Sequence, residues 1–311
     1  MSKLKFFEIN GSRVDNTFAE AFPMKVARIV ITAENHNWAM KSAASMTGFA
    51  TSVIACGCEA GIEMKISKSD TPDNRPGVSV LIFSVSEKEL TKQIENRVGQ
   101  CVLTCPTTSV FSGFESGKTL NLLKNLRFFG DGWQTSKMIN GKRFWRIPTM
   151  DGEFFGEESV SFQKGIGGGN LIILAKDTKC ALKIAEAGVD AIKNLENVIT
   201  PFPGGVVRSG SKVGSKYKNL MASTNERFCP ALINLIDNSE LSDDIGCVME
   251  IVIDGVSEKD VFQAMKISME AILAIGQDSG LLRISAGNYG GKLGPYHFNL
   301  NDICKEINFG K

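Results

Sequence analysis

Apolar and polar positions divide the first half of the chain into six predicted elements, in the order strand, helix, strand, strand, helix, strand. Short aliphatic and β-branched runs indicate the strands, and apolar positions that recur every three or four residues indicate the helices. The elements lie at residues 25–33, 36–46, 50–56, 77–85, 86–98 and 100–105. Their order is that of a βαββαβ unit.

The second half repeats this order, at residues 170–176, 180–195, 197–202, 247–255, 258–275 and 281–286. The sequence VSEKE at 85–89 recurs as VSEKD at 256–260, each time between a β-branched run and a predicted helix. Serine and glutamate are common helix starters, so a chance match of two caps is the alternative, but the shared order of six elements favours internal duplication. We therefore expect an α+β protein of two ferredoxin-like lobes, each a sheet with helices on one face.

Glycine and aromatic residues concentrate at 113–165, between the two repeats, where Trp133 and Trp145 lie. This composition predicts β-hairpins that cover a lobe surface or form a subunit contact. The predicted domains are residues 1–165, an N-terminal lobe with a β-rich insert, and residues 166–311, a C-terminal lobe. A chain of 311 residues is long enough for two separately packed lobes.

The charge balance argues against a nucleic-acid or membrane partner. The 35 basic and 34 acidic side chains leave a formal net charge of +1, which is too small for a global attractive field. The N-terminal sequence MSKLKFFEIN lacks the apolar run of a secretion signal, and no stretch approaches the ~20 apolar residues of a membrane helix. We expect a soluble, cytoplasmic protein that recognises its ligands locally.

Eight cysteines and only two histidines give little support for a metal centre. Disulfide scaffolds belong to small secreted domains, so we expect most of these cysteines to be free thiols. Cys56 with Cys58, and Cys101 with Cys105, are closely spaced, but the chain has no paired Cys-x-x-Cys knuckles. We predict no metal site, and a metal-binding cysteine protein is kept as an alternative.

The segment at residues 201–230 combines glycines, hydroxyls and cations at a density that a purely structural loop does not need. Glycine lets the backbone approach a ligand closely, and arginine and lysine donate to carboxylates or phosphates. An anionic small molecule is the expected ligand, and a surface loop with solvated lysines is the alternative. The residues that indicate the site are Gly204, Gly205, Gly210, Gly214, Arg208, Lys212, Lys216 and Lys218.

Glu250 interrupts the otherwise apolar run at residues 248–253. An ionised carboxylate buried there without a partner would cost several kcal/mol. Because burial raises the pKa of a carboxyl group, Glu250 is expected to stay neutral near pH 7 and to donate a hydrogen bond to a developing oxyanion. The alternative is a structural ion pair with Arg208 or Lys212.

A second polar strip, RISAGNYGGKLGPY at residues 283–296, begins in the last predicted strand. Asn288, Tyr289 and Lys292 are its candidate ligand-binding residues, because neighbouring glycines again allow close backbone approach. Loops at sheet ends commonly carry chemistry, and a tight glycine turn between edge strands is the alternative.

Several long segments, spread in order over nearly the whole chain, resemble the formylmethanofuran:tetrahydromethanopterin formyltransferases. The matching segments are NTFAEAF at 16–22, TGFATSV at 47–53, EAGIE at 59–63, TPDNRPG at 71–77, GQCV at 99–102, and residues 201–215 and 284–294. The sequences CGC at 56–58 and VVR at 206–208 are more similar to the branch found in methylotrophic bacteria than to the methanogen enzymes.

The resemblance implies a cytoplasmic homo-oligomer, typically a tetramer, whose subunit has two ferredoxin-like lobes and no metal or tightly bound cofactor. It implies reversible transfer of a formyl group between two cosubstrates, formylmethanofuran and N5 of tetrahydromethanopterin. The family's active-site glutamate falls on Glu250, in the matching segment MEIVI at 249–253. In the bacterial branch it also implies association with formylmethanofuran hydrolase subunits, so a mainly assembling subunit of such a complex is a second alternative.

Formyl transfer of this kind agrees with the residues. One amine attacks the formamide carbon in a ternary complex, and a tetrahedral oxyanion forms before the other amine leaves. We expect protonated Glu250 to donate to the formyl oxygen, while Ser209, Ser211 and Asn225 order the pterin and furan ends. The anionic tails of the cosubstrates are expected to bind Arg208, Lys212, Lys216, Lys218 and Lys292.

Overall fold

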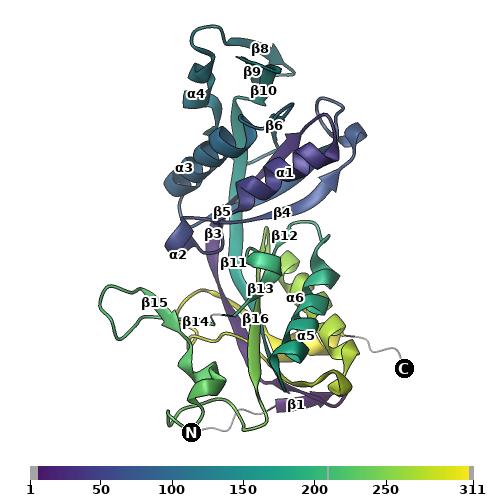
Figure 1. Cartoon of the computed structure of the whole chain (residues 1–311), viewed down its shortest axis with the longest axis vertical. Coiled ribbons are helices and arrows are strands. Elements are labelled where there is room, and N and C mark those ends of the chain that lie inside the picture. The colour runs from purple at the N-terminus through teal and green to yellow at the C-terminus, as the bar shows by residue number, and fades with distance from the viewer. Residues whose placement is uncertain (1–5, 209, 308–311) are drawn as a thin grey trace. The chain divides into compact units, whose positions relative to one another are not determined.

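The computed structural model describes residues 6–208 and 210–307 (Figure 1). The described residues fall into two compact units. The terminal unit comprises those within 1–23, 166–193 and 202–311, and the central unit those within 24–165 and 194–201. The predicted boundary after residue 165 coincides with one limit of the units, whereas residues 1–23 and 194–201 each group with the other half of the chain.

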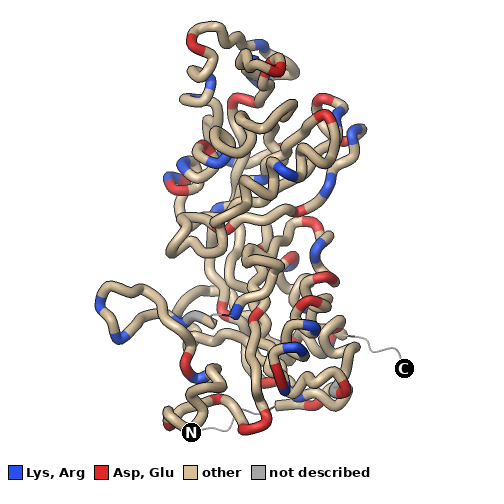
Figure 2. The backbone as a smooth tube through the Cα atoms, viewed as in Figure 1, with Lys and Arg blue, Asp and Glu red and all other residues tan. Residues whose placement is uncertain are grey.

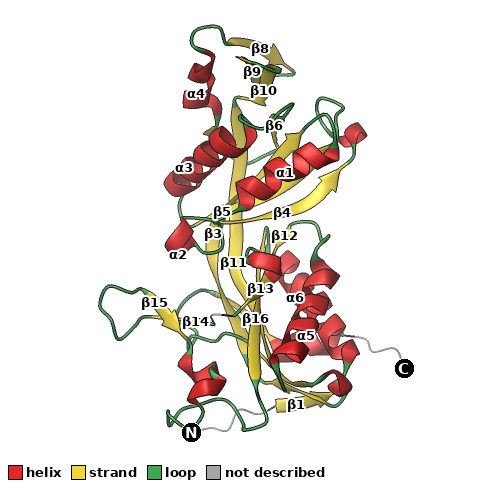
Figure 3. Cartoon of the chain, viewed as in Figure 1, coloured by secondary structure: helices red, strands yellow, loops and turns green. Residues whose placement is uncertain are grey.

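The central unit is built on four strands in the order β4-β5-β3-β6. They are β3 (Phe18–Thr32), β4 (Glu59–Ile66), β5 (Gly77–Ser84) and β6 (Ser109–Ser112), of which β3 is shared with the terminal unit. The helices α1 (His36–Thr47) and α3 (Glu87–Arg97) pack their apolar sides on this sheet (Figure 3). Each helix begins at a side-chain cap, Asn35 for α1 and Ser86 for α3.

Two predicted strands of the first half are wrong. Residues 50–56 contain a short helix, α2 (Val53–Cys56), which Ser52 caps and Gly57 ends in the left-handed conformation. Residues 100–105 overlap a π-helical turn, η2 (Val98–Val102), that continues α3. In both places a short apolar run suits a buried helical turn as well as a strand, so periodicity alone does not separate them.

The insert forms hairpins, as its composition predicts. The strands β8 (Thr135–Ile139), β9 (Lys142–Thr149) and β10 (Gly152–Glu157) pair antiparallel in sequence order, and β10 pairs in parallel with β6. The other elements of the central unit are β7 (Lys118–Asn121), α4 (Leu123–Leu126), β12 (Val198–Ile199) and the 3-10 turns η1 (Lys68–Asp70) and η3 (Arg127–Gly130).

The terminal unit has a sheet in the order β13-β16-β11-β17-β2-β1. Its strands are β1 (Phe6–Ile9), β2 (Ser12–Asp15), β11 (Ser159–Ala175), β13 (Val206–Val207), β16 (Cys247–Gly255) and β17 (Leu281–Ser285), with β11 shared with the central unit. The helices α5 (Thr178–Ile192) and α6 (Glu258–Ile275) cover one face of β16. Gly188 permits this packing, because a Cβ there would lie 2.9 Å from Ile251 Cδ1 on β16 and 2.7 Å from Ser268 Oγ on α6.

The chain between β13 and β16, which we call the hairpin segment, covers the other face of the terminal sheet. It contains a hairpin of β14 (Ser211–Val213) and β15 (Ala222–Thr224), followed by the 3-10 turns η5 (Glu226–Phe228) and η6 (Pro230–Leu232). Ile245 from this segment packs with Ile172 and Leu174 of β11, and Phe228 packs against the same cluster. The unit also contains η4 (Pro203–Gly205), η7 (Gln277–Ser279), β18 (Tyr296–Asn299) and α7 (Leu300–Glu306).

Positive and negative side chains are interspersed within both units (Figure 2), which agrees with the near-zero formal charge of +1. Within residues 6–208 and 210–307, no helix has both the length and the apolar character needed to cross a membrane.

Candidate active site

Strand pairing places Glu250 in the interior of the terminal sheet. On β16 it lies directly opposite Ile172 of β11 and Val207 of β13. Directly opposite residues of antiparallel strands point to the same face of a sheet, and successive residues alternate between faces. Since Ile251 faces α5 and α6, the row of Val207, Glu250 and Ile172 points to the face that the hairpin segment covers.

The Glu250 side chain is buried, with 8% of the residue exposed. Burial raises the pKa of its carboxyl group to about 7, well above the ordinary value of 4.5. No described lysine or arginine forms an ion pair with Glu250, and Lys212 instead pairs with Glu226 of the same hairpin segment. The alternative of a structural ion pair with Arg208 or Lys212 is therefore wrong for the described residues, and with a pKa of about 7 Glu250 is partly protonated at neutral pH.

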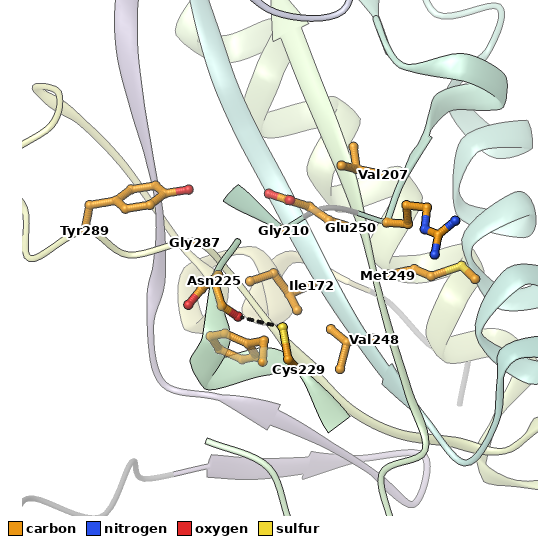
Figure 4. Close-up of a pocket in the computed structure, with 12 residues that line it drawn as sticks. Ile172, Val207, Gly210, Asn225, Cys229, Val248, Met249, Glu250, Gly287 and Tyr289 are labelled. Carbon is orange, nitrogen blue, oxygen red and sulfur yellow. Dashed lines mark hydrogen bonds between the residues drawn. The ribbon is translucent and has the colours of Figure 1, made fainter. Parts of the chain in front are cut away.

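A small cavity of about 40 Å³ lies against Glu250. The hairpin segment contributes Asn225 and Cys229 to its wall, and the loop after β17 contributes Gly287 and Tyr289. Figure 4 shows the Tyr289 hydroxyl and the Glu250 carboxyl pointing toward one another. A cavity needs about 10–15 Å³ to hold one water molecule, so this space has room for a small chemical group.

The loop that carries Tyr289 is held by Glu20 of β3, a residue that the sequence analysis does not single out. The backbone N–H groups of Tyr289, Gly291, Leu293 and Gly294 all donate to its carboxylate. Burial acts to raise the pKa of Glu20, but these four hydrogen bonds outweigh it and the pKa is lowered. An ionised, buried carboxylate therefore fixes one side of the site.

The pKa of Tyr289 is raised, whereas that of Glu20 is lowered. Burial, followed by the negative charges of Glu250 and Glu20, raises the pKa of its hydroxyl to about 12. The hydroxyl group consequently keeps its proton throughout the physiological pH range, and a protonated phenol can donate a hydrogen bond.

Asn225 closes the base of the hairpin and lines the cavity. Its backbone N–H donates to Gly210 O at 2.5 Å, and its carbonyl accepts from Cys229 Sγ at 3.4 Å (Figure 4). Cys229 is a second residue that the sequence analysis missed, because its position in the site depends on the turn η5 and not on a motif.

Some of the predicted site residues line this cavity: Arg208, Gly210, Asn225, Glu250 and Tyr289. Arg208 is exposed at its edge, and Asn288 and Lys292 are exposed in the neighbouring loop. Gly204 and Gly205 form the turn η4, with φ values of 62° and 75°, just before β13. Ser209 lies outside the described residues, and for Ser211 the structure describes the backbone of β14.

The eight cysteines, all within the described residues, are free thiols. In the same residues, no group of three or more histidine, cysteine, aspartate or glutamate side chains is arranged to hold a metal ion.

Two sequence models of one enzyme family account for almost the whole chain. The model described as formylmethanofuran-tetrahydromethanopterin formyltransferase matches residues 7–149, and the model for the proximal lobe of the same family matches residues 152–303. This chain belongs to the formylmethanofuran-tetrahydromethanopterin formyltransferase family. The family resemblance drawn from the sequence segments is thereby confirmed.

Individual relatives cover nearly the full length of the chain. The formylmethanofuran–tetrahydromethanopterin formyltransferase of Methylobacillus flagellatus is 58% identical over 299 residues, which are 95% of this chain and 99% of that relative. Solved structures of the formyltransferase family agree with the fold. The formyltransferase from Methanosarcina barkeri superposes with a TM-score of 0.89 at 48% identity, over 96% of this chain and 100% of that one.

A chain in the crystal structure of the formyltransferase/hydrolase complex from Methylorubrum extorquens, solved in complex with methylofuran, superposes with a TM-score of 0.93. It is 45% identical, over 96% of this chain and 99% of that one. The mixed α/β architecture of this formyltransferase family member is therefore that of the solved family structures.

Proposed function

We propose that this protein transfers a formyl group reversibly between formylmethanofuran and N5 of tetrahydromethanopterin. Membership of the formyltransferase family over residues 7–303 supports the reaction, because relatives named for it cover almost the whole chain. The single observation that carries the mechanism is a buried glutamate with a raised pKa, Glu250, against a cavity of about 40 Å³.

Glu250 acts as a neutral hydrogen-bond donor. The N5 amine attacks the formyl carbon, the carbonyl oxygen becomes negative, and the protonated carboxyl group stabilises that charge. The C–N bond to methanofuran then breaks, N5 loses its proton, and the departing amine gains one. Glu250 keeps its own proton overall, so no covalent enzyme intermediate is required, and the main task of the site is to hold both cosubstrates together.

The size of the cavity divides the cosubstrates into two regions. The formyl group enters the cavity, while the pterin and furan bodies lie outside it, along the hairpin segment and the loop after β17. Arg208, at the edge of the cavity, is the best placed cation for an anionic tail, with Lys216, Lys218 and Lys292 as further exposed candidates. Lys212 is less available, since it pairs with Glu226. Ser209, Ser211, Asn288, Gly204 and Gly205 are kept as proposed substrate-binding residues.

The two units correspond to two ferredoxin-like lobes from an internal duplication in this proposal. The strand order in the central unit is β4-β5-β3-β6, and the order β13-β16-β11-β17 in the terminal unit has the same relation to the sequence. In each unit, the strand that comes first in the sequence lies between the third strand and the fourth. In each unit, one helix connects the first strand to the second, and another helix connects the third strand to the fourth. This common strand order supports the duplication and goes further than the sequence order alone.

The protein works in the cytoplasm as a homo-oligomer, expected to be a tetramer, without a tightly bound cofactor. Association with formylmethanofuran hydrolase subunits is the alternative assembly, supported by the similarity to a chain of the formyltransferase/hydrolase complex. Retention of a buried, protonated Glu250 favours an active enzyme over a purely assembling subunit in either case.

The test is an assay of the purified protein with formylmethanofuran and tetrahydromethanopterin, followed by the absorbance of the formylated pterin. The wild-type protein should form product, and Glu250→Gln should reduce kcat by about 10²–10³-fold, the usual loss for one oxyanion donor. Absence of transfer by the wild-type protein would reject the proposed reaction. Near-normal transfer by Glu250→Gln would reject the role of Glu250 alone.

A further inference from the structure

The loop after β17 is unusually well fixed for a segment without regular structure. Glu20 Oε2 accepts from the N–H groups of Tyr289 at 3.0 Å and Gly291 at 2.9 Å, and Glu20 Oε1 accepts from Gly294 at 3.0 Å. Leu293 donates a fourth bond to the same carboxylate. Glu20 itself is 1% exposed, so these bonds are shielded from competing water.

Two close backbone approaches hold the same loop in place. The N–H of Gly287 donates to Asn170 Oδ1 at 2.6 Å, and a Cβ at Gly287 would lie 2.7 Å from Asn170 Nδ2. At the other end of the loop, a Cβ at Gly294 would lie 2.1 Å from the backbone oxygen of Ala21. The backbone on both sides of Tyr289 is therefore anchored to β3 and β11.

The anchored loop places the Tyr289 hydroxyl at the cavity, opposite Glu250. Both residues line the cavity, and their polar groups point toward one another (Figure 4). An oxygen atom in this space of about 40 Å³ would face the Glu250 carboxyl group of β16 and the Tyr289 hydroxyl of the loop after β17. Two donors that face one oxygen in this way suit an oxyanion.

We propose that Tyr289 is a second catalytic hydrogen-bond donor to the formyl oxygen, and that Glu20 is the positioning residue that holds Tyr289 there. The proposal rests on the proposed function, in which Glu250 supplies the first donor. It adds a residue that contacts the reacting oxygen and one that acts through the loop backbone.

The chemistry needs no additional reactant. Tyr289 lends its proton to a hydrogen bond as the formyl oxygen becomes negative, and keeps it when the tetrahedral intermediate collapses. The hydroxyl stays protonated because its pKa is about 12, and the Glu250 carboxyl group opposite, with a pKa of about 7, is neutral below that pH. A tyrosine hydroxyl and a protonated carboxylic acid are known to act together on one oxyanion.

The direct test is Tyr289→Phe, which removes the hydroxyl and keeps the ring. We expect kcat to fall by about 10²–10³-fold while KM for both cosubstrates changes by less than about threefold. The matched control is Tyr296→Phe, the same chemical change on β18 and outside the lining of the cavity, which should leave both constants within about twofold of wild type. A Tyr289→Phe variant that folds and keeps more than a third of wild-type kcat overturns the proposal.

A double variant separates shared action from independent effects. If Tyr289 and Glu250 donate to the same oxygen, Tyr289→Phe with Glu250→Gln should lose much less than the product of the two single losses. Glu20→Gln should lower kcat and should add little to Tyr289→Phe, since it acts through the same hydroxyl. Fully multiplicative losses in both pairs would contradict the proposal.

A fluorinated tyrosine at position 289 provides a test that does not depend on the fold of the phenylalanine variant. Difluorotyrosine keeps the ring and the hydroxyl but lowers the hydroxyl pKa, so the alkaline decline of kcat that ionisation of Glu250 begins above about pH 7 should be steeper than in the wild-type protein. An unchanged alkaline profile would overturn the role of Tyr289. Failure of the proposed function is distinguishable, because then the wild-type protein itself transfers no formyl group.

Discussion

The Oε2 atom of Glu20 accepts a hydrogen bond of 3.0 Å from the backbone N–H of Tyr289, across 269 positions of sequence. Three further N–H groups of the same loop donate to this carboxylate. Because the interaction joins the start of β3 to the loop after β17, it links stability of the terminal unit to geometry of the site.

The first prediction concerns acid stability. The folded pKa of Glu20 is lowered from 4.5, so its stabilising contribution is complete above about pH 4.5 and is lost as pH falls through the folded pKa. Glu20→Gln should therefore lower the free energy of unfolding at pH 7 and flatten its decline below pH 4.5. Urea unfolding between pH 3 and pH 7 measures both, with the exposed Glu8→Gln as a control that should follow wild type. An identical pH dependence in Glu20→Gln would contradict this account.

The second prediction concerns Glu250, whose folded pKa is raised to about 7 from 4.5. The unfolded chain ionises first, so folding stability falls as pH rises from about 4.5 to 7, by about 3 kcal/mol in total. Glu250→Gln removes this dependence. The free energy of unfolding of the variant minus that of wild type should therefore be larger at pH 8 than at pH 4. Transfer by the wild-type protein should decline above about pH 7, as the donor ionises. If the free energy of unfolding depends on pH in the same way in both proteins between pH 4 and pH 8, Glu250 is not held neutral.

The third prediction concerns Arg208 at the edge of the cavity. Arg208 is exposed and forms no ion pair with a described carboxylate, so its charge is free to bind an anionic cosubstrate tail. Arg208→Glu should raise KM for one cosubstrate by about tenfold or more, equivalent to about 1.4 kcal/mol, and should change kcat much less. The increase should shrink at 0.5 M salt, roughly three times the ionic strength of the cell.

A matched control for this charge reversal is Lys183→Glu. Lys183 is exposed on α5, which covers the opposite face of the sheet from Glu250. Steady-state kinetics of the two variants should therefore differ. Equal effects would indicate a response to net charge, and a fall in kcat alone for Arg208→Glu would place Arg208 in the chemical step.

The fourth prediction concerns the central unit, where Glu63 and Arg28 form a buried ion pair with 1% and 14% of their side chains exposed. Glu63 also accepts from Ser79 Oγ and from the backbone N–H of Asn197, both at 2.7 Å. Glu63→Gln leaves the Arg28 charge without its partner, and should cost about 3–5 kcal/mol in the free energy of unfolding.

The surface pair of Arg146 and Glu153 is the matched control for that measurement. Both side chains are more than 40% exposed, so Glu153→Gln should cost less than about 1 kcal/mol. Denaturant unfolding of the two variants gives the comparison. Equal losses would mean that the buried pair contributes no more than a surface pair.

The sequence predicts the regular elements best where periodicity and capping agree. The predicted segments 247–255 and 258–275 coincide with β16 and α6, because a long apolar run is followed by Ser257, whose side chain caps the helix. The sequence predicts less well where an apolar run is short, as at residues 50–56 and 100–105, since a single buried helical turn has the same composition.

The site shows a similar division. Glu250 is predictable because a carboxylate in an aliphatic strand needs an explanation, and the same argument applies to Glu20 between Ala19 and Ala21. Its partners, however, are backbone N–H groups of a distant loop, which no side-chain motif records. The hairpin of β14 and β15 is likewise hidden, because its glycines and lysines are equally typical of an irregular loop.

The separation of Glu20 from Tyr289 has a consequence for the synthesis of the protein. A growing polypeptide on the ribosome carries Glu20 early, but it lacks the four N–H groups that this carboxylate requires until residue 294 has been added. Until then the carboxylate of Glu20 stays solvated and the loop that carries Tyr289 is not fixed. A chain that stops before residue 294 therefore cannot assemble this side of the cavity.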